Sequence, residues 1–282
     1  MGMWQKLLHK WLKAPYILHT TQYQTPKHYG STVILLHGIG SSTAMWGAVA
    51  TKLPSNTRVI ALDLLGFGKS PKPNWNTHSA RTQADSIATT LFAMRITGPV
   101  IVVGHSLGAL VAIEFARRYP IMTRQLILVS PPLYDIDKEP RSGIAYHPHK
   151  MLRNVHAAMS NHPDAVATLL SLASQYKLVN RGFDVSRIDL PTFLGTLETA
   201  IINQTSMHDL VQLKKPTTII TGKFDPFVSE PTIRRLAKEH PRISTMSILA
   251  GHEVTGLMES TVVKTINRSV GAVTPKKVLT QA

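Results

Sequence analysis

Short runs of apolar residues recur along the chain, and most are followed by a turn and then by a stretch with helical periodicity. Continuous apolar runs of this length are typical of strands that are buried on both faces of a parallel sheet. The expected strands are Thr32–Leu36, Val59–Leu62, Val100–Val103, Leu126–Val129, Thr218–Thr221 and Thr245–Leu249. The expected helices lie near 44–53, 79–94, 107–118, 230–239 and 259–269. The pattern therefore predicts an α/β fold with a mostly parallel central sheet and helices on both faces.

One long stretch interrupts this alternation. Residues 133–213 separate two expected strands by far more than one crossover helix requires, and they contain helix-like segments near 149–160, 164–179 and 192–212. We interpret this stretch as a helical cap or lid inserted into the core. The predicted division is an amphipathic basic helix at 1–14, core at 15–132, cap at 133–213, core at 214–272 and a flexible tail at 273–282.

Residues 3–13 have their own pattern, in which apolar positions share one helical face and lysines lie elsewhere on the helix. The apolar positions are Trp4, Leu7, Leu8, Trp11 and Leu12, and the lysines are Lys6, Lys10 and Lys13. Trp and Leu on one side with Lys on the other are typical of a helix that lies on an anionic membrane surface. The alternative is that the apolar face packs on the body of the protein.

Charge and composition narrow the class of protein. The chain has 31 Lys and Arg against 16 Asp and Glu, a formal net charge of +15, and it contains no cysteine. Disulfides and a cysteine nucleophile are therefore excluded. The basic residues are scattered and no aromatic-rich nucleic-acid motif accompanies them, so we predict no specific nucleic-acid partner. Without a secretory signal pattern, we expect a cytoplasmic protein that can associate peripherally with a membrane.

A candidate nucleophile lies directly after an expected strand and before a helix. The segment Gly104-His105-Ser106-Leu107-Gly108 has the Gly-x-Ser-x-Gly pattern of a nucleophile elbow, a strained turn that lifts the serine Oγ clear of the backbone. The positions two before and two after the serine must lack side chains, because the turn presses them against neighbouring backbone. Gly104 and Gly108 meet this demand.

Four ordered motifs make the chain resemble the α/β-hydrolase superfamily. They are Leu36-His37-Gly38-Ile39-Gly40, the segment Asp63–Ser70, the elbow, and Gly222-Lys223-Phe224-Asp225 followed by Gly251-His252. The resemblance covers roughly residues 30–270 except the cap. It implies that an acid and then a histidine follow the serine along the chain. We assign the glycines of Asp63–Ser70 to turn formation and give them no chemistry.

Asp225 and His252 each follow a later expected strand, with one helix between the two strands. Parallel strands return both residues to the carboxyl edge that carries Ser106, so the three are expected to form a Ser-His-Asp triad. Asp135 and Asp137, after the strand Leu126–Val129, are the alternative acids. The remaining histidines fit the base less well: His240 ends a helix, His208 lies in the cap, His105 is expected to position the turn, and His147, His149 and His156 have no metal-ligand spacing.

The resemblance also implies an oxyanion hole made by main-chain N–H groups. The expected donors are Leu107, directly after the nucleophile, and Ile39, in the loop after His37, whose side chain is expected to anchor that loop. Apolar residues adjoin the candidate catalytic segments and are expected to form an acyl pocket, although packing explains Met45 and Trp46 equally well. These pocket candidates are Met45, Trp46, Leu133, Phe227 and Val254.

The predicted reaction is hydrolysis of a carboxylic ester through an acyl-enzyme on Ser106. Lactone, thioester and carbon–carbon bond hydrolysis and acyl transfer use the same triad and stay open as alternatives. A hypothesis of another class is a ligand sensor or an anionic-surface binding protein on the same fold. No cofactor or metal motif is present, so the expected partners are a small-molecule acyl substrate and, through residues 3–13, an anionic membrane surface.

Overall fold

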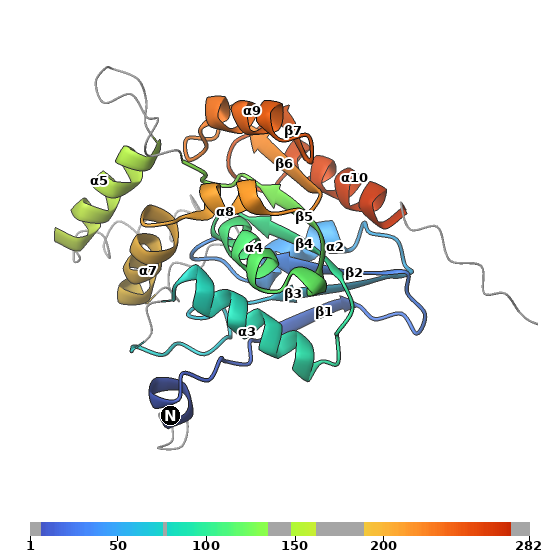
Figure 1. Ribbon diagram of the computed structural model, residues 1–282, viewed down its shortest axis with the longest axis horizontal. Coiled ribbons are helices and arrows are strands. Elements are labelled where there is room, and N and C mark those ends of the chain that lie inside the picture. The colour runs from blue at the N-terminus through green and yellow to red at the C-terminus, as the bar shows by residue number, and fades with distance from the viewer. Residues whose placement is uncertain (1–6, 76–77, 135–147, 162–188, 272–282) are drawn as a thin grey trace, which may run out of the picture.

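The computed structural model describes residues 7–75, 78–134, 148–161 and 189–271. Seven strands form one sheet in the order β1-β3-β2-β4-β5-β6-β7, and all neighbours are parallel except β1 and β3 (Figure 1). The strands are β1 (Thr20–Gln24), β2 (Ser31–Leu36), β3 (Thr57–Leu62), β4 (Val100–His105), β5 (Thr123–Val129), β6 (Thr217–Gly222) and β7 (Ile243–Ile248). The predicted, mostly parallel α/β sheet is confirmed.

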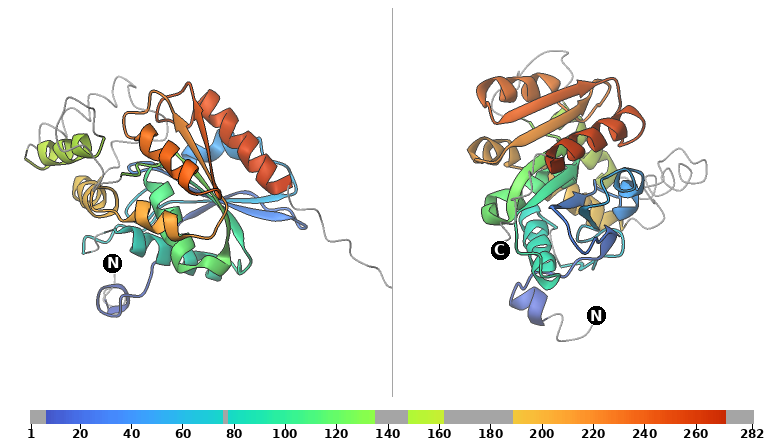
Figure 2. Two further views of the ribbon diagram at one scale, coloured as in Figure 1. Left: turned by 45° about the horizontal axis from the view of Figure 1, so that its top comes forward. Right: turned by 90° about the vertical axis from the view of Figure 1, so that its right-hand side faces the viewer.

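Helices cover both faces of the sheet (Figure 2). One face carries α3 (Ala80–Ala93), α4 (Leu107–Arg118), α8 (Ser206–Gln212) and α9 (Glu230–Glu239); the other carries η2 (Thr43–Trp46), α2 (Gly47–Ala50) and α10 (Leu257–Gly271). Successive strand residues alternate between these faces: Ile34 and Leu36 belong to the first core cluster, whereas Val33 and Leu35 belong to the second. Burial on both faces explains why the strands read as continuous apolar runs.

Strand β1 was not predicted from the sequence. Its sequence, Thr-Thr-Gln-Tyr-Gln, has no apolar run, and it pairs antiparallel with β3 at the edge of the sheet. Polar side chains fix it in place: Tyr23 donates to the carbonyl of Thr43, and the Gln24 amide donates to the carbonyl of Ala50. An edge strand held by hydrogen bonds carries little hydrophobic signal.

The helices expected between β5 and β6 are described in part. α5 (Pro148–Asn161) matches the segment near 149–160, whereas the segment near 164–179 lies outside the described residues. The helix-like segment predicted near 192–212 is helical but divided, because the chain forms α7 (Leu190–Thr196), the π-helical η5 (Leu197–Ile202) and α8. Asn203 leaves the helical conformation with φ −97° and ψ 33° and so separates η5 from α8. The domain division stays a prediction.

Two short elements complete the described chain, the π-helical turn η1 (Leu7–Trp11) and the 3₁₀ turn η3 (Pro120–Met122). The expected helix near 44–53 is shorter than predicted and consists of η2 followed by α2.

Within the described ranges, every helix falls short of the length and apolar character needed to traverse a lipid bilayer.

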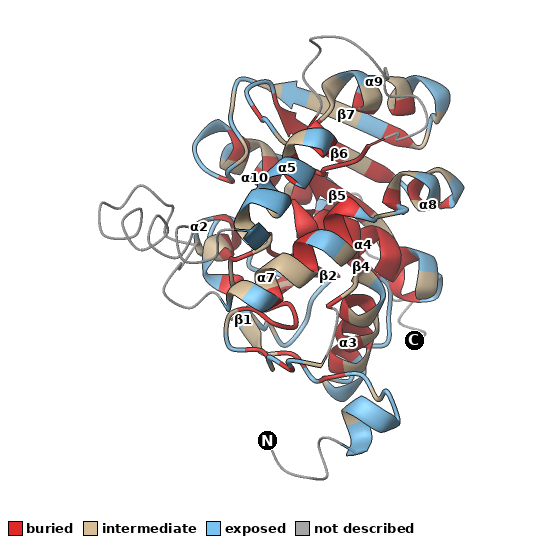
Figure 3. Cartoon of the chain, turned by 90° about the vertical axis from the view of Figure 1, so that its left-hand side faces the viewer, coloured by how far each residue is buried: buried red, intermediate tan, exposed pale blue. Residues whose placement is uncertain are grey.

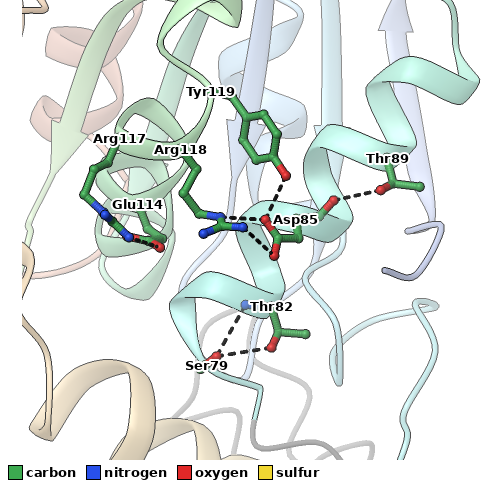
Figure 4. Close-up of polar contacts among 8 residues, drawn as sticks. All are labelled: Ser79, Thr82, Asp85, Thr89, Glu114, Arg117, Arg118 and Tyr119. Atoms are coloured by element: carbon green, nitrogen blue, oxygen red, sulfur yellow. Dashed lines mark hydrogen bonds and ion pairs between the residues drawn. The ribbon is translucent and has the colours of Figure 1, made fainter. Parts of the chain in front are cut away.

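A polar clamp joins α3 to the carboxyl end of α4, the helix that begins at the candidate nucleophile (Figure 4). The Arg118 guanidinium donates to both carboxylate oxygens of Asp85 at 2.6 and 3.0 Å, and the Tyr119 hydroxyl donates to Oδ1 of the same carboxylate at 2.7 Å. Bidentate, charge-assisted contacts of this kind fix orientation as well as distance. The clamp therefore restrains α4 at the end opposite Ser106.

Replacing Asp85 by Ala should lower the free energy of unfolding by about 1–3 kcal/mol, because Arg118 and Tyr119 would lose a shared, partly buried acceptor. Urea denaturation measures this. Arg234→Ala, which removes an exposed ion pair with Glu230 within α9, is the matched control and should cost at most about 0.5 kcal/mol. Equal losses in the two variants would contradict a clamp at Asp85.

Candidate active site

Ser106 lies in a strained turn between β4 and α4. Its φ of 53° and ψ of −118° are unusual for a residue with a side chain, and its N–H donates to the carbonyl of Val129 at 3.0 Å. A Cβ on Gly104 would overlap the carbonyl oxygen of Gly108, and one on Gly108 would overlap that of Leu36. The turn expected from the sequence is therefore present, and both glycines are required for the close approach.

Asp225 and His252 follow the adjacent parallel strands β6 and β7. The two loops are joined by main-chain hydrogen bonds, from Lys223 N–H to the Ile248 carbonyl at 2.8 Å and from Phe224 N–H to the Ala250 carbonyl at 3.0 Å. A Cβ on Gly222 would overlap the carbonyl oxygens of Ala250 and Gly251, so this approach also depends on a glycine. The joined loops bring the two side chains into contact.

The imidazole of His252 is oriented by the carboxylate of Asp225. His252 Nδ1 donates to Asp225 Oδ2 at 2.8 Å, and the other carboxylate oxygen accepts the Phe227 N–H at 2.9 Å. Burial raises the pKa of Asp225, but the hydrogen bond and charge of His252, together with hydrogen bonds from Ser130 and the Phe227 N–H, outweigh it, so the pKa lies below its ordinary value. With an ionised Asp225 accepting from Nδ1, neutral His252 keeps its lone pair on Nε2, as a general base requires.

Phe227 and Tyr134 support this pair. The Phe227 ring meets the His252 ring edge to face, with centroids 4.8 Å apart, and the Tyr134 hydroxyl donates to the Phe227 carbonyl at 2.7 Å. The Phe227 side chain therefore restricts rotation of the imidazole while its N–H holds the carboxylate.

His105, inside the elbow, connects the nucleophile turn to the histidine loop. Its Nε2–H donates to the main-chain carbonyl of His252 at 2.9 Å, and the two rings lie 4.9 Å apart. Burial and the nearby His252 lower the pKa of His105 to about 3. A neutral His105 adds no positive charge beside His252, so the arrangement agrees with positioning rather than with a second base.

The loop after β2 is held by His37. Its Nδ1–H donates to the Gly38 carbonyl at 2.7 Å, and its Nε2 accepts the Leu64 N–H at 2.9 Å, which ties the loop to the one after β3. Burial lowers the pKa of His37, which keeps the ring neutral in this role. Among the hydrogen bonds of the described residues, none uses the N–H of Ile39 or Leu107, so both donors are free for a ligand.

Ser106 and His252 line one cavity of about 580 Å³ at the carboxyl edge of the sheet. Three of the five pocket candidates also line it, namely Met45, Phe227 and Val254. Ile39, a predicted oxyanion donor, contributes to the wall as well. Ser106, His252, Ile39 and three of the pocket candidates therefore meet at one concave site, where strand ends meet in an open α/β sheet.

Two pocket candidates do not line the cavity. Trp46 is fully buried in the core cluster beneath α2, because the η2 and α2 turns direct Ala44, Met45 and Ala48 to the cavity and Trp46 to the sheet. Leu133 is fully buried in the cluster on the opposite face of the sheet. Proximity along the chain to a catalytic segment suggested both, but the side-chain directions exclude them.

Sequence reasoning missed the wall that the helices between β5 and β6 supply. α5 contributes positions at i, i+3 and i+7, and α7 with η5 contributes positions at four-residue intervals, so each set forms one helical stripe. These residues are Leu152, Val155, Met159, Phe193, Leu197 and Ile201. The periodicity of the sequence predicted these helices, but it did not show which helical face lines the cavity that contains Ser106.

Only some of the alternative acids and bases lie among the described residues. Asp135, Asp137 and His147 lie outside the described residues. His149 donates to the Ile202 carbonyl, His208 contacts Gln212 on α8, and His240 ends α9. Across the ranges that the structure describes, no group of histidine and carboxylate side chains could hold a metal ion.

The family is decided by comparison with known proteins. A model of the alpha/beta hydrolase fold family matches residues 31–254. The chain belongs to this family.

An uncharacterised protein of Mycobacterium tuberculosis is 42% identical over 101 residues, which are 36% of this chain and 29% of that protein. The "Probable lysophospholipase BODYGUARD 2" of Arabidopsis thaliana is 34% identical over 111 residues, 38% of this chain and 24% of that protein. These matches span less than a third of each relative.

Solved structures extend the likeness over the whole fold. An esterase from Thermogutta terrifontis has a TM-score of 0.65 and 23% identity, covering 90% of this chain and 93% of that one. The enol-lactonase from Burkholderia xenovorans has a TM-score of 0.67 and 17% identity, covering 91% and 96%. At these identities the structures establish the fold, and together with the family match they support a hydrolase.

Replacing His105 by Gln should flatten the pH dependence of stability. Unfolded histidine binds a proton below about pH 6.5, whereas folded His105 stays neutral to about pH 3, so acid destabilises the wild type by up to about 1.4 kcal/mol per pH unit in this window. Gln does not titrate and keeps an N–H donor for the His252 carbonyl. Urea unfolding at pH 7, 5.5 and 4.5 measures the difference. Exposed His28→Gln is the control, and a wild-type slope in His105→Gln would contradict this account.

Proposed function

We propose that the protein is a serine hydrolase that cleaves carboxylic esters through an acyl-enzyme on Ser106. The observation that carries this proposal is the oriented His252–Asp225 pair, joined at 2.8 Å, in the same cavity as a serine held in a strained elbow. A site that had lost its catalytic role would not require both a strained turn at Ser106 and a hydrogen-bonded His252–Asp225 pair.

In the proposed mechanism, His252 Nε2 takes the proton of Ser106 Oγ as that oxygen attacks the ester carbonyl carbon. The N–H groups of Ile39 and Leu107 receive the developing oxyanion. The tetrahedral intermediate expels the alkoxide, which takes the proton from His252, and leaves the acyl group on Ser106. Water, deprotonated by His252, then attacks the acyl carbon, and the second tetrahedral intermediate releases the acid as Ser106 Oγ leaves and takes the proton back from His252. Asp225 stabilises the imidazolium in both halves of the cycle.

The character of the cavity favours a neutral substrate with an apolar acyl part. The walls described above supply apolar side chains, and among the described lining residues there is no Lys or Arg that could receive a carboxylate or phosphate. The charged side chains at the lining, besides histidine, are Glu253 and Glu259, and Glu259 is paired with Lys52. An anionic substrate would therefore meet the Glu253 carboxylate and no Lys or Arg among the described lining residues.

The names of related proteins support acyl chemistry. The Thermogutta terrifontis protein is named an esterase, the Arabidopsis thaliana relative a probable lysophospholipase, and a Sus scrofa relative, 35% identical over 102 residues, a 1-acylglycerol-3-phosphate O-acyltransferase. Lactone, thioester and carbon–carbon bond hydrolysis and acyl transfer use the same triad, and a panel of such substrates separates them from ester hydrolysis. A ligand sensor on this fold would bind esters without turnover.

Ser106→Ala should abolish labelling by a fluorophosphonate probe and lower kcat for p-nitrophenyl butyrate by at least about 10⁴-fold, because no other nucleophile replaces Oγ. Ser41→Ala removes the other serine among the described lining residues and is the matched control, with labelling retained. The enzyme proposal would be refuted if the probe labelled neither serine of the wild type and the wild type turned over no ester, lactone or thioester of the panel.

A pair of substrates of matched length tests the preference for neutral acyl groups. The kcat/KM for mono-p-nitrophenyl adipate should be at least about tenfold below that for p-nitrophenyl hexanoate, because the terminal carboxylate would be desolvated without a partner. The neutral methyl p-nitrophenyl adipate separates charge from size and should be cleaved faster than the acid. Equal kcat/KM for the acid and its methyl ester would contradict the charge argument.

A further inference from the structure

The π-helical turn η1 presents its apolar side chains to solvent. Leu7 and Leu8 are 43% and 44% exposed, and Trp11 and Leu12 are 74% and 67% exposed. No residue of this turn is buried. The apolar face predicted from the sequence, in the part that the structure describes, therefore does not pack on the body of the protein; Trp4 and Lys6 lie outside the described residues.

The opposite side of the same turn attaches it to the protein. The His9 ring stacks on Tyr16 with centroids 4.0 Å apart, and His9 Nδ1 donates to the Ala14 carbonyl at 2.8 Å. Tyr16 is itself buried in the core cluster on the α3 face. In Figures 1 and 3 the turn lies at the α3 end of the molecule and projects from the body, and Figure 3 colours most of it as exposed. Because His9 anchors one side of the turn to the protein, the apolar side chains on the other side point outward.

Charge is distributed unevenly along the chain in the same region. Residues 1–62 contain no Asp or Glu; Asp63 is the first acidic residue. The basic residues of this stretch are Lys6, Lys10, Lys13, Lys27, Lys52 and Arg58. Lys10 and Lys13 are exposed and flank the outward Trp11 and Leu12. A segment that combines exposed Trp and Leu with lysines and itself carries no acidic residue is complementary to a negatively charged, partly apolar partner.

We propose that residues 7–13 form a docking element for an anionic phospholipid bilayer. Leu7, Leu8, Trp11 and Leu12 would enter the boundary between headgroups and acyl chains, while Lys10 and Lys13 would contact anionic headgroups. A bilayer accounts for both features of the surface, whereas a nucleic acid would account for the lysines and leave four large apolar side chains in water. The proposal does not depend on the reaction at Ser106.

Flotation of the whole protein with vesicles tests the proposal. Vesicles of phosphatidylcholine with an equal share of phosphatidylglycerol should bind the wild type, and vesicles of phosphatidylcholine alone should bind it at least about tenfold more weakly. Trp11→Ser with Leu12→Ser should lower the partition coefficient for anionic vesicles at least about tenfold. Ile121→Ser, at an isoleucine that is 86% exposed elsewhere on the surface, is the matched control and should bind as the wild type does.

A second pair of variants separates local charge from net charge. Lys10→Gln with Lys13→Gln should weaken binding several-fold, whereas Lys214→Gln with Lys238→Gln removes the same charge elsewhere and should have little effect. Turnover of a water-soluble ester in each variant reports on the active site independently.

Three results would overturn the proposal. The first is that the wild type does not bind anionic vesicles. The second is that Trp11→Ser with Leu12→Ser binds as tightly as Ile121→Ser, which would leave a purely electrostatic attraction. The third is sedimentation showing a dimer that this double variant dissociates, which would make a second copy of the chain the partner that covers the face.

Discussion

The strained conformation of Ser106 is the constraint on which the rest of the site depends. A residue with φ of 53° between a strand and a helix persists only where the surroundings enforce it. Here the enforcement is close contact of main chains, since Gly104 and Gly108 let β4, α4 and the end of β2 approach one another without side chains between them. The buried helix α4 then holds the turn from behind, and the clamp at Asp85 restrains the far end of that helix.

Candidate catalytic groups from distant parts of the chain meet because the loops at this edge are bonded to one another. His37 joins the loops after β2 and β3, His105 joins the elbow to the His252 loop, and main-chain hydrogen bonds join the loops after β6 and β7. The chain has no cysteine, so no disulfide contributes. Burial keeps both linking histidines neutral, which lets them serve as hydrogen-bonding groups without disturbing the charge of the His252–Asp225 pair.

The sequence predicted those features that follow from local rules. Buried parallel strands carry apolar runs, and the elbow carries glycines, so the sheet and the positions of Ser106, Asp225 and His252 at its edge could be predicted. β1 was missed because hydrogen bonds rather than burial hold it. Trp46 and Leu133 were misplaced, and the stripe containing Leu152 and Leu197 was missed, because the direction of a side chain depends on how whole elements pack, which neighbours along the chain do not specify.

The proposed docking element and the cavity use different parts of the molecule and differ in charge. The chain carries a net charge of +15, yet the described lining of the cavity has no Lys or Arg. In the docking proposal the basic groups act at the surface, where positive charge attracts an anionic partner over about one Debye length, while the described lining of the cavity carries no Lys or Arg. A cavity that binds an anionic substrate would be expected to contain an arginine, because a guanidinium pairs well with a carboxylate or phosphate. The described walls lack such an arginine, which supports the proposed preference for an uncharged acyl group.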